Sequence, residues 1–232
     1  GYTDDRIILI VEDDIADNVS NPNKGVIQVT IGGNNVYENV EIDYRMSSLK
    51  AKDILAILNG EKSETLPTVI ESTENDNLFV FWSGHGVPGA MCWDEEPYAM
   101  TGDDLSTVFK DMNLKRRYRK LLMMVEACFS GGVMEQCEGI PGMLFITAAN
   151  GDETSKADVF NGEMKVWMSN RFTSTFIEQI TDNKDVAMRD LYYRLFINTV
   201  GSHVMVYNAE NYGNLYSANM SEFINFKNDK SK

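Results

Sequence analysis

The sequence has few of the residues on which disulfide-rich, metal-binding and membrane proteins depend. It contains 3 cysteines and 2 histidines in 232 residues. Three thiols are too few for a disulfide framework and lack the C-x-x-C spacing of a structural zinc site, so at least one stays free. No apolar run reaches the roughly 18 residues of a transmembrane helix. We therefore expect no metal, no other cofactor and no membrane span.

Positive charge is also scarce, with 21 Lys and Arg against 35 Asp and Glu and a formal net charge of −14. Such a field repels nucleic acids and anionic membranes, and both are excluded as partners. The one basic cluster, at 115–120, is interpreted as a solvated helix end, where cations complement the backbone carbonyls. The N-terminal residues lack the basic and then apolar pattern of a signal peptide.

Continuous apolar runs predict buried β-strands. Runs of this kind are typical of parallel strands that are covered on both faces. They occupy residues 6–12, 78–82, 121–125, 142–148 and, late in the chain, 203–207. Residues 26–31 and 36–40 flank a Gly-Gly-Asn-Asn turn and predict a β-hairpin.

Helical patterns lie between these runs, at 51–58, 101–112, 171–180 and 186–200. Ser47 or Ser48 is expected to cap the first helix and Gly60 to end it, and Thr101 is expected to cap the second. Strands that alternate with helices predict a single α/β domain with a mostly parallel sheet and helices on both faces. Sheets of this type bind ligands at the carboxyl ends of their strands.

Two reactive side chains follow successive predicted strands. His85 lies in Ser-Gly-His-Gly after one strand, and Cys128 lies in Glu-Ala-Cys-Phe-Ser-Gly-Gly after the next. Adjacent parallel strands would place these loops about 5 Å apart. A thiol beside an imidazole is the arrangement that cysteine nucleophiles use, and the amides of Gly86 and Cys128 could stabilise an oxyanion.

Structural interpretations compete with this one. A lone cysteine at a strand end, such as Cys128, is more often a small buried hydrophobe. Cys92 and Cys137 lie in segments without strand-end glycines, and we interpret both as structural. His203, inside an apolar run, is expected to be a hydrogen-bonded sheet residue, and the pair Asp13-Asp14 is expected to anchor a turn. Glu126 is harder to explain structurally, because a buried carboxylate needs a partner or a pocket.

At these residues the sequence resembles the legumain family of asparaginyl endopeptidases and the related catalytic subunit of the GPI transamidase, in the caspase-like clan. The matching segments occur in the family's order and are spread over most of the chain. They are DDIA (13–16), NP (21–22), VY (36–37), DY (43–44), the strand that ends in HG (79–86), EAC with SG (126–131), TAAN (147–150) and SHVM (202–205).

The resemblance implies a caspase-like α/β/α sandwich and a cysteine peptidase. His85 would be the base, Cys128 the nucleophile, and the Gly86 and Cys128 amides the oxyanion hole. Family members cleave after Asn, sometimes Asp. The pocket that reads this side chain would use Glu126, Thr154, Ser155 and, across a gap in the alignment, Glu163.

The chain also departs from the family. It begins after the family's first strand, which carries an Arg-His pair for the pocket and an Asn that orients the catalytic His. We expect this strand to be an N-terminal fragment of the same precursor that stays bound. Ser83-Gly84 replaces an acidic neighbour of the His, as in the transamidase branch. The resemblance favours a secreted, periplasmic or lysosomal location and a peptide or protein substrate.

Three functions follow from these residues. The first is an endopeptidase that cuts after Asn or Asp through a thioester. The second is a transpeptidase or transamidase, in which an amine resolves the same intermediate. The third, a binding scaffold without catalysis, has the intact His85 and Cys128 pair against it. A thiol redox protein lacks the C-x-x-C motif.

Overall fold

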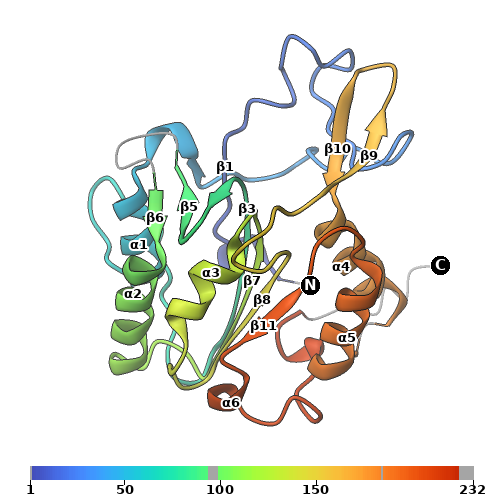
Figure 1. Ribbon diagram of the computed structural model, residues 1–232. Coiled ribbons are helices and arrows are strands. Elements are labelled where there is room, and N and C mark those ends of the chain that lie inside the picture. Colours follow the sequence, from blue (N-terminus) through green and yellow to red (C-terminus); the bar gives the residue numbers. More distant parts are fainter. Residues whose placement is uncertain (1, 94–98, 184, 225–232) are drawn as a thin grey trace, which may run out of the picture.

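The computed structural model describes residues 2–93, 99–183 and 185–224, and its centre is a four-stranded sheet in the order β11-β8-β7-β3 (Figure 1). β3 (Asn77–Ser83), β7 (Lys120–Glu126) and β8 (Met143–Thr147) are parallel, and β11 (Met205–Tyr207) is antiparallel to β8. The predicted, mostly parallel sheet is confirmed.

Helices cover both faces of this sheet. On β7, Leu121, Met123 and Val125 point into one apolar core, while Leu122 and Met124 point into the other. The first core contains α1 (Ala51–Leu58), α2 (Gly102–Leu114) and α3 (Ser130–Met134). The second contains α4 (Arg171–Asp182), α5 (Met188–Asn198) and α6 (Ala209–Tyr212). The fold is the expected three-layer α/β/α sandwich.

The predicted helix signals act largely as expected. Thr101 caps α2: its hydroxyl accepts from the Asp104 N–H, and Asp104 reaches back to the Thr101 N–H. Gly60 follows α1 with φ +70°, and a side chain there would lie 2.6 Å from the Ile70 carbonyl oxygen. The predicted α1 cap is wrong, because Lys50 is the N-cap and Ser47 lies in the preceding 3₁₀ turn.

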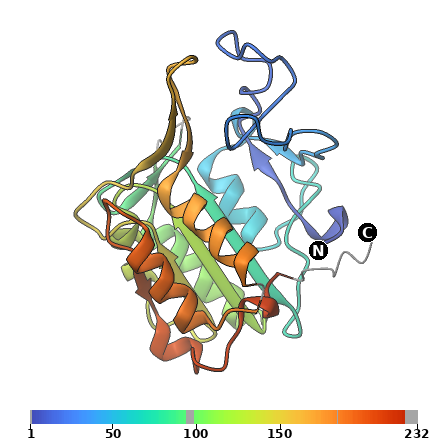
Figure 2. The ribbon, with the colours of Figure 1, turned by 90° about the vertical axis from the view of Figure 1, so that its right-hand side faces the viewer.

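Two antiparallel structures occupy segments for which the sequence predicts no strand. β4 (Gly86–Val87), β5 (Ala90–Cys92) and β6 (Ala99–Thr101) form a small sheet after His85. β9 (Ala157–Asn161) and β10 (Val166–Asn170) form a hairpin that projects from the body of the molecule (Figure 2). Their strands are too short, or too polar, for periodicity to predict them.

The N-terminal predictions are wrong in two places. Residues 6–12 contain only β1 (Ile10–Val11), which pairs with β2 (Tyr44–Arg45) outside the main sheet. No strand forms over residues 26–40, where one backbone bond, from Val36 to Ile27, joins the two halves. Apolar side chains there stay exposed, with Ile31 at 66%. A hairpin needs a surface to pack on, and this segment has none.

The remaining elements are short 3₁₀ helices at η1 (Asp4–Arg6), η2 (Met46–Ser48), η3 (Glu135–Cys137) and η4 (Met220–Glu222). Within the described ranges, no helix is long and apolar enough to cross a bilayer.

The stacked pair Phe109 and Phe145, 5.6 Å apart, joins α2 to the sheet in the first core, and both rings are fully buried. We expect Phe109→Ala to lower the free energy of unfolding by about 3–5 kcal/mol, because it leaves a cavity. Phe196→Ala makes the same chemical change at a residue that is 44% exposed, and it should lower the free energy of unfolding far less. Urea unfolding measures both, and equal losses would contradict this account of the core.

Candidate active site

The pairing of β3 with β7 determines where His85 and Cys128 lie. The two strands are in register up to Ser83 opposite Glu126, so both chains leave the sheet at the same edge. The Gly84 N–H donates to the Glu126 carbonyl at 3.1 Å and carries the pairing one residue further. The expected adjacency of the two strand ends is confirmed.

Gly86 packs directly on the backbone of Cys128. A Cβ at this position would overlap the Cys128 carbonyl oxygen and lie 3.3 Å from the Ala127 Cβ. Only glycine fits. His85 thus sits between two contacts with the 126–128 segment, one made by Gly84 and one by Gly86, while its own ring is exposed.

Cys128 stands on a sharp turn between β7 and α3. The next residue, Phe129, has φ +56°, an unusual conformation for a non-glycine residue, and its N–H donates to the Glu153 carbonyl at 2.8 Å. At Gly131 a side chain would lie 2.5 Å from the Tyr207 hydroxyl and 2.8 Å from the Asn150 backbone. These contacts bend the chain tightly and leave the Cys128 thiol half-buried at the sheet edge.

The loop after β8 brings Ser155 to the nucleophile candidate. The Ser155 hydroxyl lies 3.8 Å from the Cys128 sulfur. Its neighbour Thr154 is exposed and accepts a bond from the Lys156 ammonium at 2.9 Å. Of the two predicted hydroxyl residues, the structure places only Ser155 in contact with the thiol.

Glu153 anchors the same loop to the segment before β11. One carboxylate oxygen accepts from the His203 N–H at 2.6 Å, and the other lies 2.9 Å from His203 Nδ1. Burial alone would raise the pKa of Glu153, but the hydrogen bonds from His203 and Asn150 hold it below its usual range. His203 is hydrogen-bonded as expected, but it precedes the strand and its ring is exposed.

Glu126 is almost fully buried, with 1% of its surface exposed, at the end of β7. Its Oε2 accepts two bonds from Thr173, from the backbone N–H at 2.9 Å and from the hydroxyl at 3.0 Å. Its Oε1 is buried and has no hydrogen-bond partner among the described residues. Burial raises the pKa of Glu126 above its usual range, and the two hydrogen bonds from Thr173 oppose that rise.

Thr173 was missed at the sequence level. The one available signal was its place in the first turn of a predicted helix, where backbone N–H groups need an acceptor. Nothing in the sequence indicates that a carboxylate 47 positions earlier supplies that acceptor.

Glu163 does not join this cluster. It is exposed in the turn between β9 and β10, about 15 Å along the strands from their base at Ala157. The acid nearer the base is Asp158, which pairs with Arg171 at 2.8 Å. The pocket role of Glu163 came from a gapped alignment and stays a prediction that this placement does not support.

By residue type, the other cysteines and Asp13 are also candidate metal ligands. Cys92 and Cys137 are free thiols, and burial raises the pKa of Cys137 to about 12. Asp13 accepts from Tyr37 at 2.7 Å and pairs with Arg45 at 2.6 Å, so it binds distant segments and not the local turn that was expected. In the part of the chain that the structure describes, no group of three His, Cys, Asp or Glu side chains could hold a metal ion.

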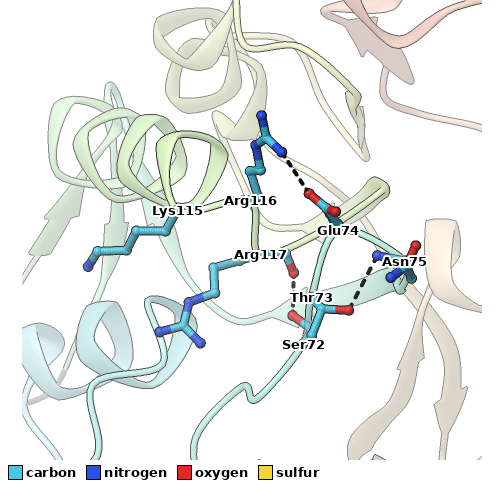
Figure 3. Close-up of a pocket in the computed structure, with 7 residues that line it drawn as sticks. All are labelled: Ser72, Thr73, Glu74, Asn75, Lys115, Arg116 and Arg117. Atoms are coloured by element: carbon cyan, nitrogen blue, oxygen red, sulfur yellow. Dashed lines mark hydrogen bonds and ion pairs between the residues drawn. The ribbon is translucent and has the colours of Figure 1, made fainter.

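A surface pocket of about 660 Å³ lies at the opposite end of the sheet (Figure 3). It is formed before β3 and β7 begin and is lined by Ser72, Thr73, Glu74, Asn75, Lys115, Arg116 and Arg117. Arg116 pairs with Glu74 at 3.2 Å, and Lys115 pairs with Asp111 at 2.6 Å. Lys115 and Arg116 therefore lie at the solvated end of α2 and are paired with acids, whereas Lys120, at the other end of the cluster, begins β7.

Comparisons with known proteins identify relatives of this chain. The sequence pattern of the Peptidase C13 family matches residues 1–223. Rat (Rattus norvegicus) legumain is 29% identical over 214 residues, which cover 89% of this chain and 48% of that protein. The vacuolar-processing enzyme of Vicia sativa is 35% identical over 161 residues, which cover 67% of this chain and 32% of that protein. The chain thus spans half or less of the length of these relatives.

A solved structure shows the same fold. Caspase-1 from Spodoptera frugiperda superposes with a TM-score of 0.53 at 12% identity, covering 92% of this chain and 87% of that one. This likeness confirms the caspase-like sandwich and nothing finer. The family match extends over His85, Cys128 and nearly every described element. On that evidence the chain belongs to the Peptidase C13 family.

Proposed function

We propose that the protein is a cysteine endopeptidase in which Cys128 is the nucleophile and His85 the general base and acid. The observation that carries the proposal is the packing of Gly86 on the Cys128 backbone, which leaves no room for any side chain other than hydrogen. This contact holds the loop that carries the imidazole against the loop that carries the thiol. Legumain and the vacuolar-processing enzyme, as relatives, support the same activity.

In the proposed reaction the Cys128 sulfur, having given its proton to His85, attacks the carbonyl carbon of the scissile peptide and forms a C–S bond. The amides of Gly86 and Cys128 stabilise the oxyanion. The C–N bond then breaks, and the proton on His85 goes to the leaving amine. Water attacks the thioester carbon and gives a proton to His85. The C–S bond then breaks, the acid product leaves, and His85 returns the proton to the Cys128 sulfur.

The specificity pocket is proposed to accept Asn. The unpaired Oε1 of Glu126 can accept from a carboxamide NH₂ group, and the Ser155 hydroxyl can donate to its oxygen. Thr154 remains in the proposal as a second hydroxyl at the rim, although here it bonds Lys156. An ionised Glu126 repels an Asp carboxylate, so Asn is favoured wherever Glu126 carries its charge.

A further strand beside β3 is also part of the proposal. β3 is an edge strand, yet it reads Asn-Leu-Phe-Val-Phe-Trp-Ser, and Phe81 stays 38% exposed. Within the described residues the buried Trp82 Nε1 has no acceptor. Long apolar edges of this kind are normally covered by another strand. We infer that an N-terminal fragment of the same precursor pairs here.

Substitution of the dyad tests the activity. Cys128→Ala and His85→Ala should each abolish cleavage of an Ala-Ala-Asn reporter, because neither thioester formation nor leaving-group protonation can proceed. Cys92→Ala removes a half-buried thiol but keeps the backbone N–H that donates to the His85 carbonyl at 3.0 Å, and it should retain cleavage. An Asn-directed electrophile should label Cys128 alone, as read by mass spectrometry.

Retained cleavage by Cys128→Ala would contradict the proposal. If wild-type protein neither cleaves the reporter nor reacts with the electrophile, the binding-scaffold interpretation holds instead. Adding an amine nucleophile separates the alternatives further, because a transpeptidase converts the same thioester into an amide product.

Selectivity should depend on pH in one direction. Burial raises the pKa of Glu126, so this side chain becomes neutral at a higher pH than an ordinary carboxyl. A neutral Glu126 no longer repels Asp and can donate to it. The ratio of kcat/KM for an Asp reporter to that for an Asn reporter should therefore rise as pH falls. A ratio that stays flat, or one unchanged by Glu126→Gln, would count against this pocket.

The N-terminal strand is tested on protein purified from its full-length precursor. Denaturing intact-mass analysis should show a second polypeptide that co-elutes with the chain, and Phe81→Asp should release it by placing a charge in the β3 edge interface. Phe160→Asp, on the projecting hairpin, is the matched control, since Phe160 is 51% exposed. Absence of a second polypeptide from active protein would exclude the inferred pairing.

A further inference from the structure

Helix α4 begins without a cap of its own. Its N-cap residue, Asn170, makes no side-chain hydrogen bond to the first turn. The first backbone N–H groups of a helix have no partner within the helix and carry its positive end. Glu126, at the end of β7, takes this place: its Oε2 accepts from the N–H of Thr173, the third residue of α4, at 2.9 Å.

The Thr173 hydroxyl adds a second bond to the same oxygen, at 3.0 Å. Both Thr173 donors bond Oε2 and so hold the carboxylate in one orientation. The other oxygen, Oε1, is buried and has no partner among the described residues. A buried acceptor without a donor is costly, and an incoming N–H group would remove that cost.

The first turn of α4 is also tied to the loop beside the nucleophile. The Arg171 N–H donates to the Lys156 carbonyl at 2.8 Å, and the Arg171 guanidinium pairs with Asp158 at 2.8 Å. Ser155, next in the chain to Lys156, lies 3.8 Å from the Cys128 sulfur. The first turn of α4 therefore contacts Glu126 and also the loop that places Ser155 beside the thiol, and α4 is the element that connects them.

We propose that Thr173 is a positioning residue for substrate selection, which holds Glu126 turned so that Oε1 is left to accept a hydrogen bond from the substrate's carboxamide. This inference rests on the proposed Asn-directed peptidase and deepens it. Thr173 touches neither the thiol nor, in this assignment, the substrate. Its effect reaches the reaction through Glu126 alone.

Loss of the hydroxyl has two consequences that a purely structural role does not have. The first is a looser Glu126, which weakens binding of the Asn side chain more than it slows bond cleavage. The second concerns protonation. The Thr173 hydroxyl lowers the pKa of Glu126, so its removal raises that pKa further. Glu126 then becomes neutral at a higher pH.

The test compares Thr173→Val, which keeps the shape and the backbone N–H, with Thr173→Ser, which keeps the hydroxyl. The matched control is Thr175→Val on the same helix, where the hydroxyl bonds the Arg171 carbonyl at 2.8 Å and not Glu126. We expect Thr173→Val to raise KM for the Asn reporter roughly five- to twenty-fold with little change in kcat, as for loss of a hydrogen bond to a charged group. Thr173→Ser should stay within about two-fold of wild type.

The ratio of Asp to Asn cleavage is measured across pH for each variant. With Thr173→Val its rise should begin at a higher pH than in wild type, and with Thr175→Val it should not move. Because the ratio is taken on one sample, it does not depend on the fraction of folded enzyme. Thermal melting of each variant separates lost stability from lost selectivity.

If Thr173→Val matches Thr175→Val in KM and in the pH dependence of the ratio, the positioning role is overturned while the peptidase stands. If Thr173→Ser raises KM for the Asn reporter as much as Thr173→Val does, the Thr173 hydroxyl is not the group that positions Glu126, and the role is also overturned. If the wild type cleaves neither reporter, the proposed function fails and the inference fails with it.

Discussion

The parallel pairing of β3 with β7 is the interaction on which the rest of the site depends. Its register, with Ser83 opposite Glu126, brings the two following loops out at one edge of the sheet. Gly86 then packs on the Cys128 carbonyl, where no larger residue fits. A slip of one residue would turn every side chain of β3 to the other face and separate the loops. The two apolar cores hold this register, because β7 sends alternate side chains into each.

The site also depends on one unfavourable group. Glu126 is buried, and burial alone would drive its carboxylate toward the neutral form. The first turn of α4 opposes this with the two bonds from Thr173, and in return the carboxylate caps a helix that lacks its own cap. The same helix turn is joined through Arg171 to the loop that carries Ser155. A carboxyl group that would destabilise an ordinary core here links the second layer of helices to the proposed catalytic edge.

Strong local signals predicted most of the framework. The runs that became β3, β7 and β8 are continuous and apolar, and Thr101 and Gly60 act through bonds and angles within a few residues. Predictions failed where the outcome depends on a distant surface. The apolar residues near Ile31 resemble a hairpin in sequence but have nothing to pack on, and β9 with β10 has too mixed a pattern to be recognised. The pocket role of Glu163 came from a gapped alignment and stays a prediction, and the structure places this residue in the turn between β9 and β10.

Sequence alone determined the sheet class, the presence of His85 and Cys128 at successive strand ends, and the family resemblance. Each of these depends on short segments of neighbouring residues that can be identified without the structure. Only the tertiary structure decided which of the predicted residues meet. It placed Ser155 on the thiol and Thr154 beside Lys156, and it joined Glu126 to Thr173 across 47 positions. The physical reason is that a buried carboxylate takes its partners from whatever donors the packed layers bring within about 3 Å, and sequence distance does not reveal which donors those are.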